Sequence, residues 1–429
     1  MSQHVSTKGD SSPAEQRLGS LFAPRLFDPV SGQMLADVLV TIRGARIESV
    51  TAGVAGPPGP EDPRWRGEVP SFSIALDAAS TALPGLIDGH THLLLQPSDI
   101  VVSPVLYKSQ AFRTIEGVAA ARRTVEAGFT TVRDVDSEGA GLADVALRDA
   151  INRGVVPGPR MFVSGEALTI TGGYMNSLGF SPDITVPDFG VACDSIPQLV
   201  AATRRNLKYG VDLVKIYATA SLPQVTPDFQ PFSQLSVDEV KAVVTEARRW
   251  GKDVAAHAYG GEGGRNAILG GVRSIEHGLF LDEDLIRLLL DHGTFWCPTL
   301  YVYSAEPGLD RFGQAFMDGI RARHRQAFRA ALEAGVKIAF GTDAGGFEAG
   351  ENAKEFKVMV DYGMTPVDAI RSATVRGAEL LRKDNDLGRV APGCFADIIA
   401  VHGNPLEDIT ALEKVAFVMK DGVVVKPRP

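Results

Sequence analysis

Two histidines near residue 90 are the first residues whose type and spacing could do chemistry. The run Pro84-Gly-Leu-Ile-Asp-Gly-His-Thr-His92 is apolar at its start and ends in His90 and His92. Because successive side chains of an extended strand point to opposite faces, His90 and His92 point the same way. Two imidazoles on one face can supply half of a metal site. One such pair alone is weak evidence, since many pairs of this kind lie on the surface.

Four further polar residues stand inside apolar segments or where they end: Lys215 within 211–218, His257 after 253–256, His277 after 274–276, and Asp343 after 336–342. Taken singly, each has a structural explanation. Lys215 could carry its ammonium to solvent along its apolar stem, and Asp343 could cap the segment that follows it. Together with His90 and His92 they make six candidate ligands, which indicates a metal site.

The elements that must position these residues lie between 84 and 385. There, strand-like segments alternate with helical ones, such as 114–127 and 236–250, each closed by a glycine, as in a parallel sheet. The sequence predicts eight strands, over residues 84–92, 129–134, 160–164, 211–218, 253–257, 274–277, 295–300 and 336–342. This pattern predicts an α/β fold, a TIM-type (β/α)8 barrel, whose chemistry lies at the carboxyl ends of the strands. The six candidate ligands fall at or near such ends.

Short β segments occupy both ends of the chain. Residues 18–83 contain strand-like runs at 38–42 and 46–50 around a turn, and 386–429 contain a hairpin that turns at Asp421-Gly422. We expect a small β-sandwich built from both termini, formed by 18–83 and 386–429 around the 84–385 barrel. Residues 1–17 are polar and predict a flexible tail.

Composition narrows the class of protein. The 429 residues are 45% hydrophobic and 22% charged, as in a globular protein, and the net charge of -9 disfavours nucleic acid or an anionic membrane as partner. Three widely spaced cysteines suggest no disulfide framework. No apolar run fits a signal peptide or a transmembrane helix. We expect a cytoplasmic protein, although a signal peptide removed before this numbering would leave the same sequence.

The motifs resemble those of the amidohydrolase superfamily over nearly the whole chain. They are the 84–92 run, Val214-Lys-Ile216, Ala256-His257, Ser274-Ile-Glu-His-Gly278, Gly341-Thr-Asp343 and Gly388-Arg-Val-Ala-Pro-Gly-Cys-Phe-Ala-Asp-Ile398. Within the superfamily, the chain resembles the branch that holds imidazolonepropionase-like proteins, metal-dependent Xaa-Pro dipeptidases and ochratoxin-hydrolysing carboxypeptidases.

This resemblance implies roles for the six ligands. His90, His92 and Asp343 would bind a buried metal ion, His257 and His277 a more exposed one, and Lys215, N6-carboxylated by carbon dioxide, would bridge the two. The ligand types suit zinc, with manganese or cobalt as alternatives. The implied reaction is attack of a metal-bridging hydroxide on an amide, with Asp343 as base and then acid.

Substrate residues are also implied. Tyr259 and Arg265 stand where the dipeptidase branch holds the substrate's terminal carboxylate, which a forked guanidinium can bind. Alternatively, Tyr259 packs in the core and Arg265 starts a surface helix. Tyr174 follows Thr169-Ile-Thr-Gly-Gly173 where many relatives carry a histidine that donates to the scissile carbonyl. A phenol can donate too. Asn176 and Ser177 are expected near the pocket.

Other features are expected to be structural. His4 lies in the tail, His402 in the sandwich, and His292 and His324 on predicted helices, where they should be solvated. Residues 282–284 should start a helix, Cys297 should pack, and the glycines of 260–264 lack the remainder of a phosphate loop.

The sequence thus predicts a binuclear metal amidohydrolase that removes the C-terminal residue of dipeptides or N-acyl amino acids, ochratoxin-like amides included. The alternatives are a cyclic-amide hydrolase of the imidazolonepropionase kind and a non-catalytic barrel scaffold. A homo-oligomer is expected, with a small-molecule substrate as the partner.

Overall fold

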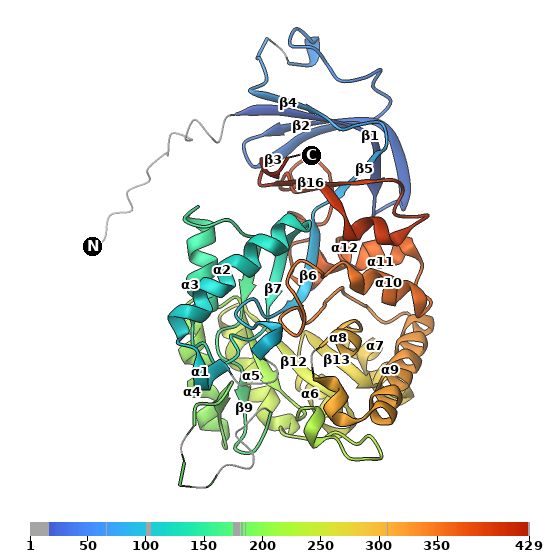
Figure 1. Ribbon diagram of the computed structural model, residues 1–429. Coiled ribbons are helices and arrows are strands. Elements are labelled where there is room, and N and C mark those ends of the chain that lie inside the picture. Colours follow the sequence, from blue (N-terminus) through green and yellow to red (C-terminus); the bar gives the residue numbers. More distant parts are fainter. Residues whose placement is uncertain are drawn as a thin grey trace, which may run out of the picture.

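Figure 1 shows the chain as a computed structural model, with a sheet at one end and a larger α/β body below it. The structure describes residues 17–65, 67–99, 104–174, 181, 183–184, 186–306 and 308–427. Most of the tail, His4, Asn176 and Ser177 lie outside these residues.

The terminal sheet has eight strands in the order β17-β16-β15-β5-β1-β2-β3, with β4 paired to β1. Its strands come from both ends of the chain: β1 Leu18–Asp28, β2 Gln33–Arg43, β3 Arg46–Thr51, β4 Phe72–Ala75, β5 Ser80–Pro84, β15 Ile398–His402, β16 Val415–Lys420 and β17 Val423–Lys426. Antiparallel pairing of β5 with β15 joins the two ends. β16 and β17 form the hairpin predicted at Asp421-Gly422, where φ is 52° and 72°, as a type I′ turn requires.

The α/β body contains two sheets whose paired strands are parallel, as the alternating pattern predicts. One has the order β6-β7-β8 and the other β10-β9-β11-β12-β13-β14. Their bounds are β6 Leu86–Thr91, β7 Phe129–Asp134, β8 Arg160–Val163, β9 Leu168–Thr169, β10 Val191–Ala192, β11 Leu213–Tyr217, β12 Asp253–Gly260, β13 Ser274–Phe280 and β14 Phe295–Cys297.

Helices connect and surround these strands (Figure 1). They are α1 Pro104–Tyr107, α2 Gln110–Glu126, α3 Ala143–Asn152, α4 Ile196–Lys208, α5 Val237–Arg249, α6 Gly261–Gly270, α7 Glu283–His292, α8 Val302–Ala305, α9 Gln314–Ala334, α10 Lys354–Asp361, α11 Pro366–Ser372 and α12 Val375–Leu380, with 3-10 turns η1 Pro63–Trp65, η2 Pro97–Asp99, η3 Leu222–Gln224, η4 Leu309–Phe312 and η5 Ile409–Glu413. None of the helices that the structure describes combines the length and apolar character needed to cross a membrane.

Two helix starts follow directly from local chemistry. Ser236 and Glu239 form a reciprocal capping box at the start of α5, which satisfies two backbone N–H groups. Asp282 caps α7 by accepting from the Leu285 N–H, as the acidic run at 282–284 predicts.

The segment predicted as an eighth strand differs from the expectation. Residues 336–342 make only the isolated bridge of Ile338 with Trp296, so the prediction of a regular strand was wrong. The segment nevertheless forms backbone hydrogen bonds with a neighbouring strand on each side. The Trp296 N–H donates to the Lys337 carbonyl at 2.9 Å, and the Gly89 N–H to the Phe340 carbonyl at 2.8 Å. It therefore lies between β14 and β6, and the left-handed backbone at Asp343 (φ 65°) ends the extended run.

A second correction concerns His324. Its place on α9 among charged neighbours predicted a solvated ring, but its side chain is buried. The ring lies 5.5 Å from that of Tyr303 and 6.1 Å from that of Trp296, centroid to centroid. The reason is that α9 turns this face toward β14 and the loop after it. By contrast, His292 at the end of α7 is exposed, as expected.

Candidate metal centre

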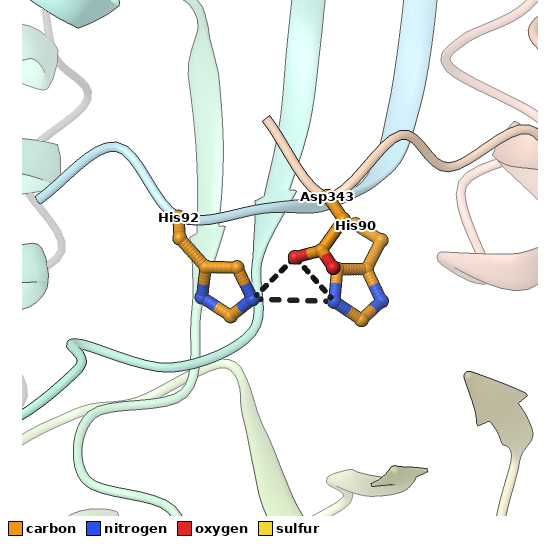
Figure 2. Close-up of side chains that lie close together, drawn as sticks. All are labelled: His90, His92 and Asp343. Carbon is orange, nitrogen blue, oxygen red and sulfur yellow. Dashed lines mark hydrogen bonds and ion pairs between the residues drawn. The ribbon is translucent and has the colours of Figure 1, made fainter. Parts of the chain in front are cut away.

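Three of the predicted ligands meet at the end of β6 (Figure 2). The His90 Nε2 atom lies 3.2 Å from His92 Nε2 and 3.6 Å from Asp343 Oδ1, and His92 Nε2 lies 3.2 Å from the same oxygen. One ligand atom from each of these residues can be chosen so that all three atoms lie within 4.8 Å of one another. Strand alternation brings the two histidines to one face, and the segment between β14 and β6 brings Asp343 to them.

The hydrogen bonds around this group show that it fits a cation. His90 Nδ1 lies 2.7 Å from a Glu276 carboxylate oxygen, an acceptor, so this nitrogen carries the proton and the Nε2 lone pair faces His92 and Asp343. Burial and the Lys215 charge lower the pKa of His90 to about 4, which keeps its imidazole neutral. Burial lowers the pKa of His92, but the Glu138 and Asp343 charges outweigh this and raise it to about 10. The position between these side chains therefore attracts positive charge strongly, as a metal site must.

The other predicted ligands surround the same group. The His277 ring lies 4.8 Å from that of His90 and 4.6 Å from that of His257, centroid to centroid, and His277 Nδ1 lies 3.8 Å from Asp343 Oδ2. Lys215 is 1% exposed. Burial lowers the pKa of Lys215 below its usual range, which favours the neutral amine. The charge of Lys215 acts on His90, His257 and Asp343, so its side chain lies near these three residues.

Backbone geometry explains how successive residues of β13 both face this cluster. Glu276 contacts His90, and strand alternation would turn the next residue, His277, away. However, His277 has φ 71°, in the left-handed region, which rotates its imidazole toward Asp343. Glu138, Thr299 and Asp343 adopt the same rare conformation, with φ of 52°, 49° and 65°. Four of the eight described non-glycine residues with positive φ thus lie around the cluster, where strain of about 1–3 kcal/mol per residue is typical of functional sites.

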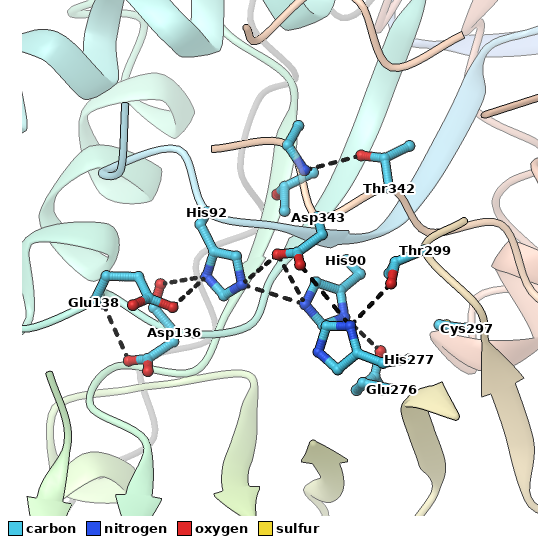
Figure 3. Close-up of polar contacts among 12 residues, drawn as sticks. His90, His92, Asp136, Glu138, Glu276, His277, Cys297, Thr299, Thr342 and Asp343 are labelled. Atoms are coloured by element: carbon cyan, nitrogen blue, oxygen red, sulfur yellow. Dashed lines mark hydrogen bonds and ion pairs between the residues drawn. The ribbon is translucent and has the colours of Figure 1, made fainter. Parts of the chain in front are cut away.

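The buried Glu276 carboxylate holds His90 in place (Figure 3). Glu276 uses one oxygen for His90 Nδ1, and its other oxygen lies 2.8 Å from the Arg133 guanidinium. Burial raises the pKa of Glu276, but the Arg133 and His90 contacts outweigh this and hold it well below its usual range. Arg133 also donates to the Ser274 hydroxyl and the Gly89 carbonyl. Sequence reasoning missed Glu276 and Arg133, although Glu276 stands beside His277 in a quoted motif.

Asp88 ties the histidine strand to the Asp343 segment. Its carboxylate accepts from the Thr342 hydroxyl at 2.6 Å, the Asn352 amide at 2.8 Å and the His90 backbone N–H at 3.0 Å. On the other side of the cluster, the Thr299 hydroxyl lies 2.9 Å from His277 Nδ1. Sequence reasoning missed these residues too. The acid two places before His90 was the one available clue.

A cavity of about 730 Å³, including space open to solvent, lies against the cluster. Its lining contains the predicted residues Tyr174 and Tyr259, together with Tyr303, which was not predicted. The Tyr174 ring stacks on Tyr217 at 3.9 Å and lies 4.6 Å from the His257 ring. The remaining lining residues are His92, Leu95, Asp99, Glu138, Phe189, Ser221, Leu222, Pro223, His277, Glu306, Arg311, Phe312, Asp343 and Gly346.

Arg265 is placed differently from the other predicted residues. It lies on α6, which follows the strand that carries His257 and Tyr259, but its side chain is exposed and it does not line the cavity. The guanidinium that does line the cavity belongs to Arg311 on η4. No motif pointed to Arg311, because its position depends on how the segment after α8 folds over the cluster.

Comparisons with known proteins agree with this geometry. Residues 81–425 match the model of the amidohydrolase family. The chain is 30% identical to ochratoxinase from Aspergillus niger over 372 residues, which cover 80% of this chain and 75% of that protein. It is 26% identical to imidazolonepropionase from Streptomyces griseus over 358 residues, which cover 78% of this chain and 82% of that protein.

Among solved structures, the fold is similar to that of a Xaa-Pro dipeptidase with methionine bound in its active site. The TM-score is 0.84 at 35% sequence identity, over 95% of this chain and 99% of the other. The fold neighbours are TIM barrels, and proteins of this family generally use metal ions, which the His90–His92–Asp343 group could hold.

These findings confirm the expected relation to the amidohydrolase superfamily. They disfavour the alternative of a non-catalytic barrel scaffold. The chain belongs to the amidohydrolase family and is a hydrolase.

Proposed function

We propose that this protein is a binuclear metal-dependent amide hydrolase that removes the C-terminal residue of dipeptides or N-acyl amino acids. The observation that carries the proposal is the meeting of His90, His92, His277 and Asp343, of which the last three line one cavity. Buried Lys215 acts electrostatically on His90 and Asp343. His90, His92 and Asp343 would hold one divalent cation and His257 and His277 the other. Zinc is the first candidate for both.

Lys215 is proposed to bridge the two cations as a carbamate. Its neutral amine would attack the carbon of carbon dioxide, so that an N–C bond forms, one C=O π bond opens onto oxygen and the nitrogen gives a proton to water, which leaves an anionic two-oxygen group. The buried, apolar surroundings that lower the pKa of Lys215 favour the neutral amine that this step needs.

The bound cations would supply a hydroxide at neutral pH and polarise the amide carbonyl. Asp343 faces the same point and would take the proton of the attacking water, then give it to the departing amine. Tyr174, at the cavity wall 4.6 Å from the His257 ring, is proposed to donate to the carbonyl oxygen as charge develops there.

The substrate proposal rests on the cavity and the relatives. Tyr259 lines the cavity and is proposed to hold the terminal carboxylate. Arg265 stays a prediction for the same role, from its position on α6. The similarity to ochratoxinase and to a Xaa-Pro dipeptidase supports amides with a C-terminal amino acid, ochratoxin-like amides included. A cyclic-amide hydrolase is the second candidate, supported by the similarity to imidazolonepropionase.

A further proposal concerns closure of the two parallel sheets into a barrel. We propose that the two parallel sheets and the 336–344 segment close into one (β/α)8 barrel over residues 84–385, since that segment is hydrogen-bonded to both neighbours. The terminal sheet is proposed to be the small sandwich formed by 18–83 and 386–429. A homo-oligomer and a cytoplasmic location stay predictions.

A substrate panel tests the function. The zinc-loaded protein is assayed for release of the C-terminal amino acid from Ala-Phe, Ala-Pro, Ala-Lys and N-acetyl-Phe, and for opening of imidazolone propionate. Release from at least one linear amide, lost in Asp343→Asn, is the expected result. Turnover of the cyclic amide alone would overturn the carboxypeptidase proposal in favour of the second candidate.

A further inference from the structure

Glu306 is a cavity residue that the proposed chemistry does not use. It directly follows α8, where its backbone N–H donates to the Val302 carbonyl, and its mostly buried side chain lines the cavity. Its carboxylate makes no hydrogen bond or ion pair to any residue that the structure describes. A buried carboxylate stays charged when a cation or donor reaches it, and is otherwise favoured in its protonated form.

The other acids of the cavity already have such partners. Asp99 lies 2.7 Å from the Lys108 ammonium, and Glu138 lies 3.3 Å from His92 Nδ1. Asp343 belongs to the metal cluster. Burial and the Asp343 charge raise the pKa of Glu306 to about 8, while Arg311 opposes the rise. Near pH 7 Glu306 is therefore largely protonated in the free protein, and a bound cation would favour its carboxylate form.

The substrate class offers one cation of the right kind. A dipeptide carries an α-ammonium group on the residue whose carbonyl is attacked, whereas an N-acyl amino acid has none. Leu95, Phe189, Leu222 and Phe312 add apolar surface to the cavity lining, and these four side chains have no donor or acceptor for an ammonium.

We propose that Glu306 binds the α-ammonium group of the substrate's N-terminal residue, so that the cavity selects dipeptides over N-acyl amino acids. This inference rests on the proposed function and names its substrate class. A hydrogen-bonded charge pair of this kind predicts a preference of about 10- to 100-fold.

Arg311 provides the competing explanation. It is exposed, lines the same cavity and acts electrostatically on Glu306, so Glu306 could serve only as its counter-charge. The Arg311 guanidinium lies 4.7 Å from the centre of the Phe312 ring, and its side chain has no ion pair among the described residues. If the two residues act only as a pair, neutralising either one should have the same effect on substrate preference.

A matched pair of substrates tests the proposal. N-propionyl-Phe is Ala-Phe with the ammonium replaced by hydrogen, so the ratio of their kcat/KM values isolates that group. In the zinc-loaded wild type near pH 7, Ala-Phe should be preferred by about 10- to 100-fold. Glu306→Gln should abolish the preference by slowing Ala-Phe alone, Glu306→Asp should keep part of it, and Arg311→Gln should keep it. Glu333→Gln, at an exposed site on α9, is the control.

Three results would overturn the inference: a wild type without the preference, a Glu306→Gln variant that slows both substrates equally, or an Arg311→Gln variant that loses the preference as Glu306→Gln does. Hydrolysis of N-propionyl-Phe with no preference for Ala-Phe leaves the amide-hydrolase proposal standing. If neither substrate nor any other linear amide is cleaved, the proposed function itself fails.

Discussion

Replacing Glu276 by glutamine tests whether the buried ion pair with Arg133 holds the metal centre together. In the wild type, one Glu276 oxygen accepts from His90 Nδ1 at 2.7 Å and the other from Arg133 at 2.8 Å. The amide keeps an acceptor for one partner only. Its NH2 group then faces either an N–H of His90 or the buried guanidinium, so one contact turns from attraction to repulsion.

Two magnitudes follow from this geometry. Arg133 would keep its bonds to the Ser274 hydroxyl and the Gly89 carbonyl but lose its nearby carboxylate. Breaking a buried pair from one side costs about 3–5 kcal/mol of unfolding free energy. His90 would lose the acceptor that fixes its tautomer, and removing such a partner typically weakens metal binding by about 10- to 100-fold.

The assay measures zinc affinity by competition with a chromogenic chelator and stability by denaturant unfolding of the metal-free protein. The control is Glu126→Gln, which breaks an exposed pair with Arg122 and should change neither quantity measurably. If Glu276→Gln binds zinc as tightly as the wild type, then Glu276 does not position His90 and the reasoning is wrong.

Three further predictions concern other groups. Lys215→Ala should lower bound zinc from two ions to one per chain and abolish turnover, as metal analysis and amide assays can check; two ions in the variant would contradict the bridging role. If Arg265 binds the substrate's terminal carboxylate, Arg265→Met should raise KM for Ala-Phe but not for the C-terminal amide of Ala-Phe. If only Arg311→Met has this effect, then Arg311 on η4 binds the carboxylate instead. Burial raises the pKa of Glu355 from 4.5 to about 8, so folding favours its protonated form. The stability it contributes is complete below pH 4.5 and is lost as pH rises toward 8. The melting temperature of the wild type should therefore fall relative to Glu355→Gln over that range, and a constant difference would refute the shift.

The ligand cluster could be predicted because strand alternation and strand ends are local properties. His90 and His92 lie two residues apart on one strand. Among the other candidate ligands, His257, His277 and Asp343 end or follow apolar runs, whereas Lys215 lies inside one. The parallel order of the strands then brings them together. The prediction failed for the segment before Asp343, which makes one isolated bridge instead of a regular strand.

Residues whose position depends on packing far along the chain could not be predicted. Arg133 meets Glu276 across 143 residues of sequence, and a charged residue inside an apolar strand does not reveal its partner. Glu306 and Arg311 line the cavity only because the segment after β14 folds back over the cluster. The burial of His324 escaped prediction for a similar reason, since the polarity of its helical neighbours describes only one side of α9.

The left-handed residues around the cluster set a limit on how stable this enzyme can become. Glycine would adopt the backbone of Thr299 or His277 without steric conflict, but it would remove the hydroxyl that holds the imidazole or the imidazole itself. Selection for thermal stability should therefore favour substitutions at these positions. The resulting variants should have a higher melting temperature and a lower turnover rate. At these positions a change that raises stability should lower activity. Stabilising substitutions that keep the activity should therefore be sought at residues away from the cluster.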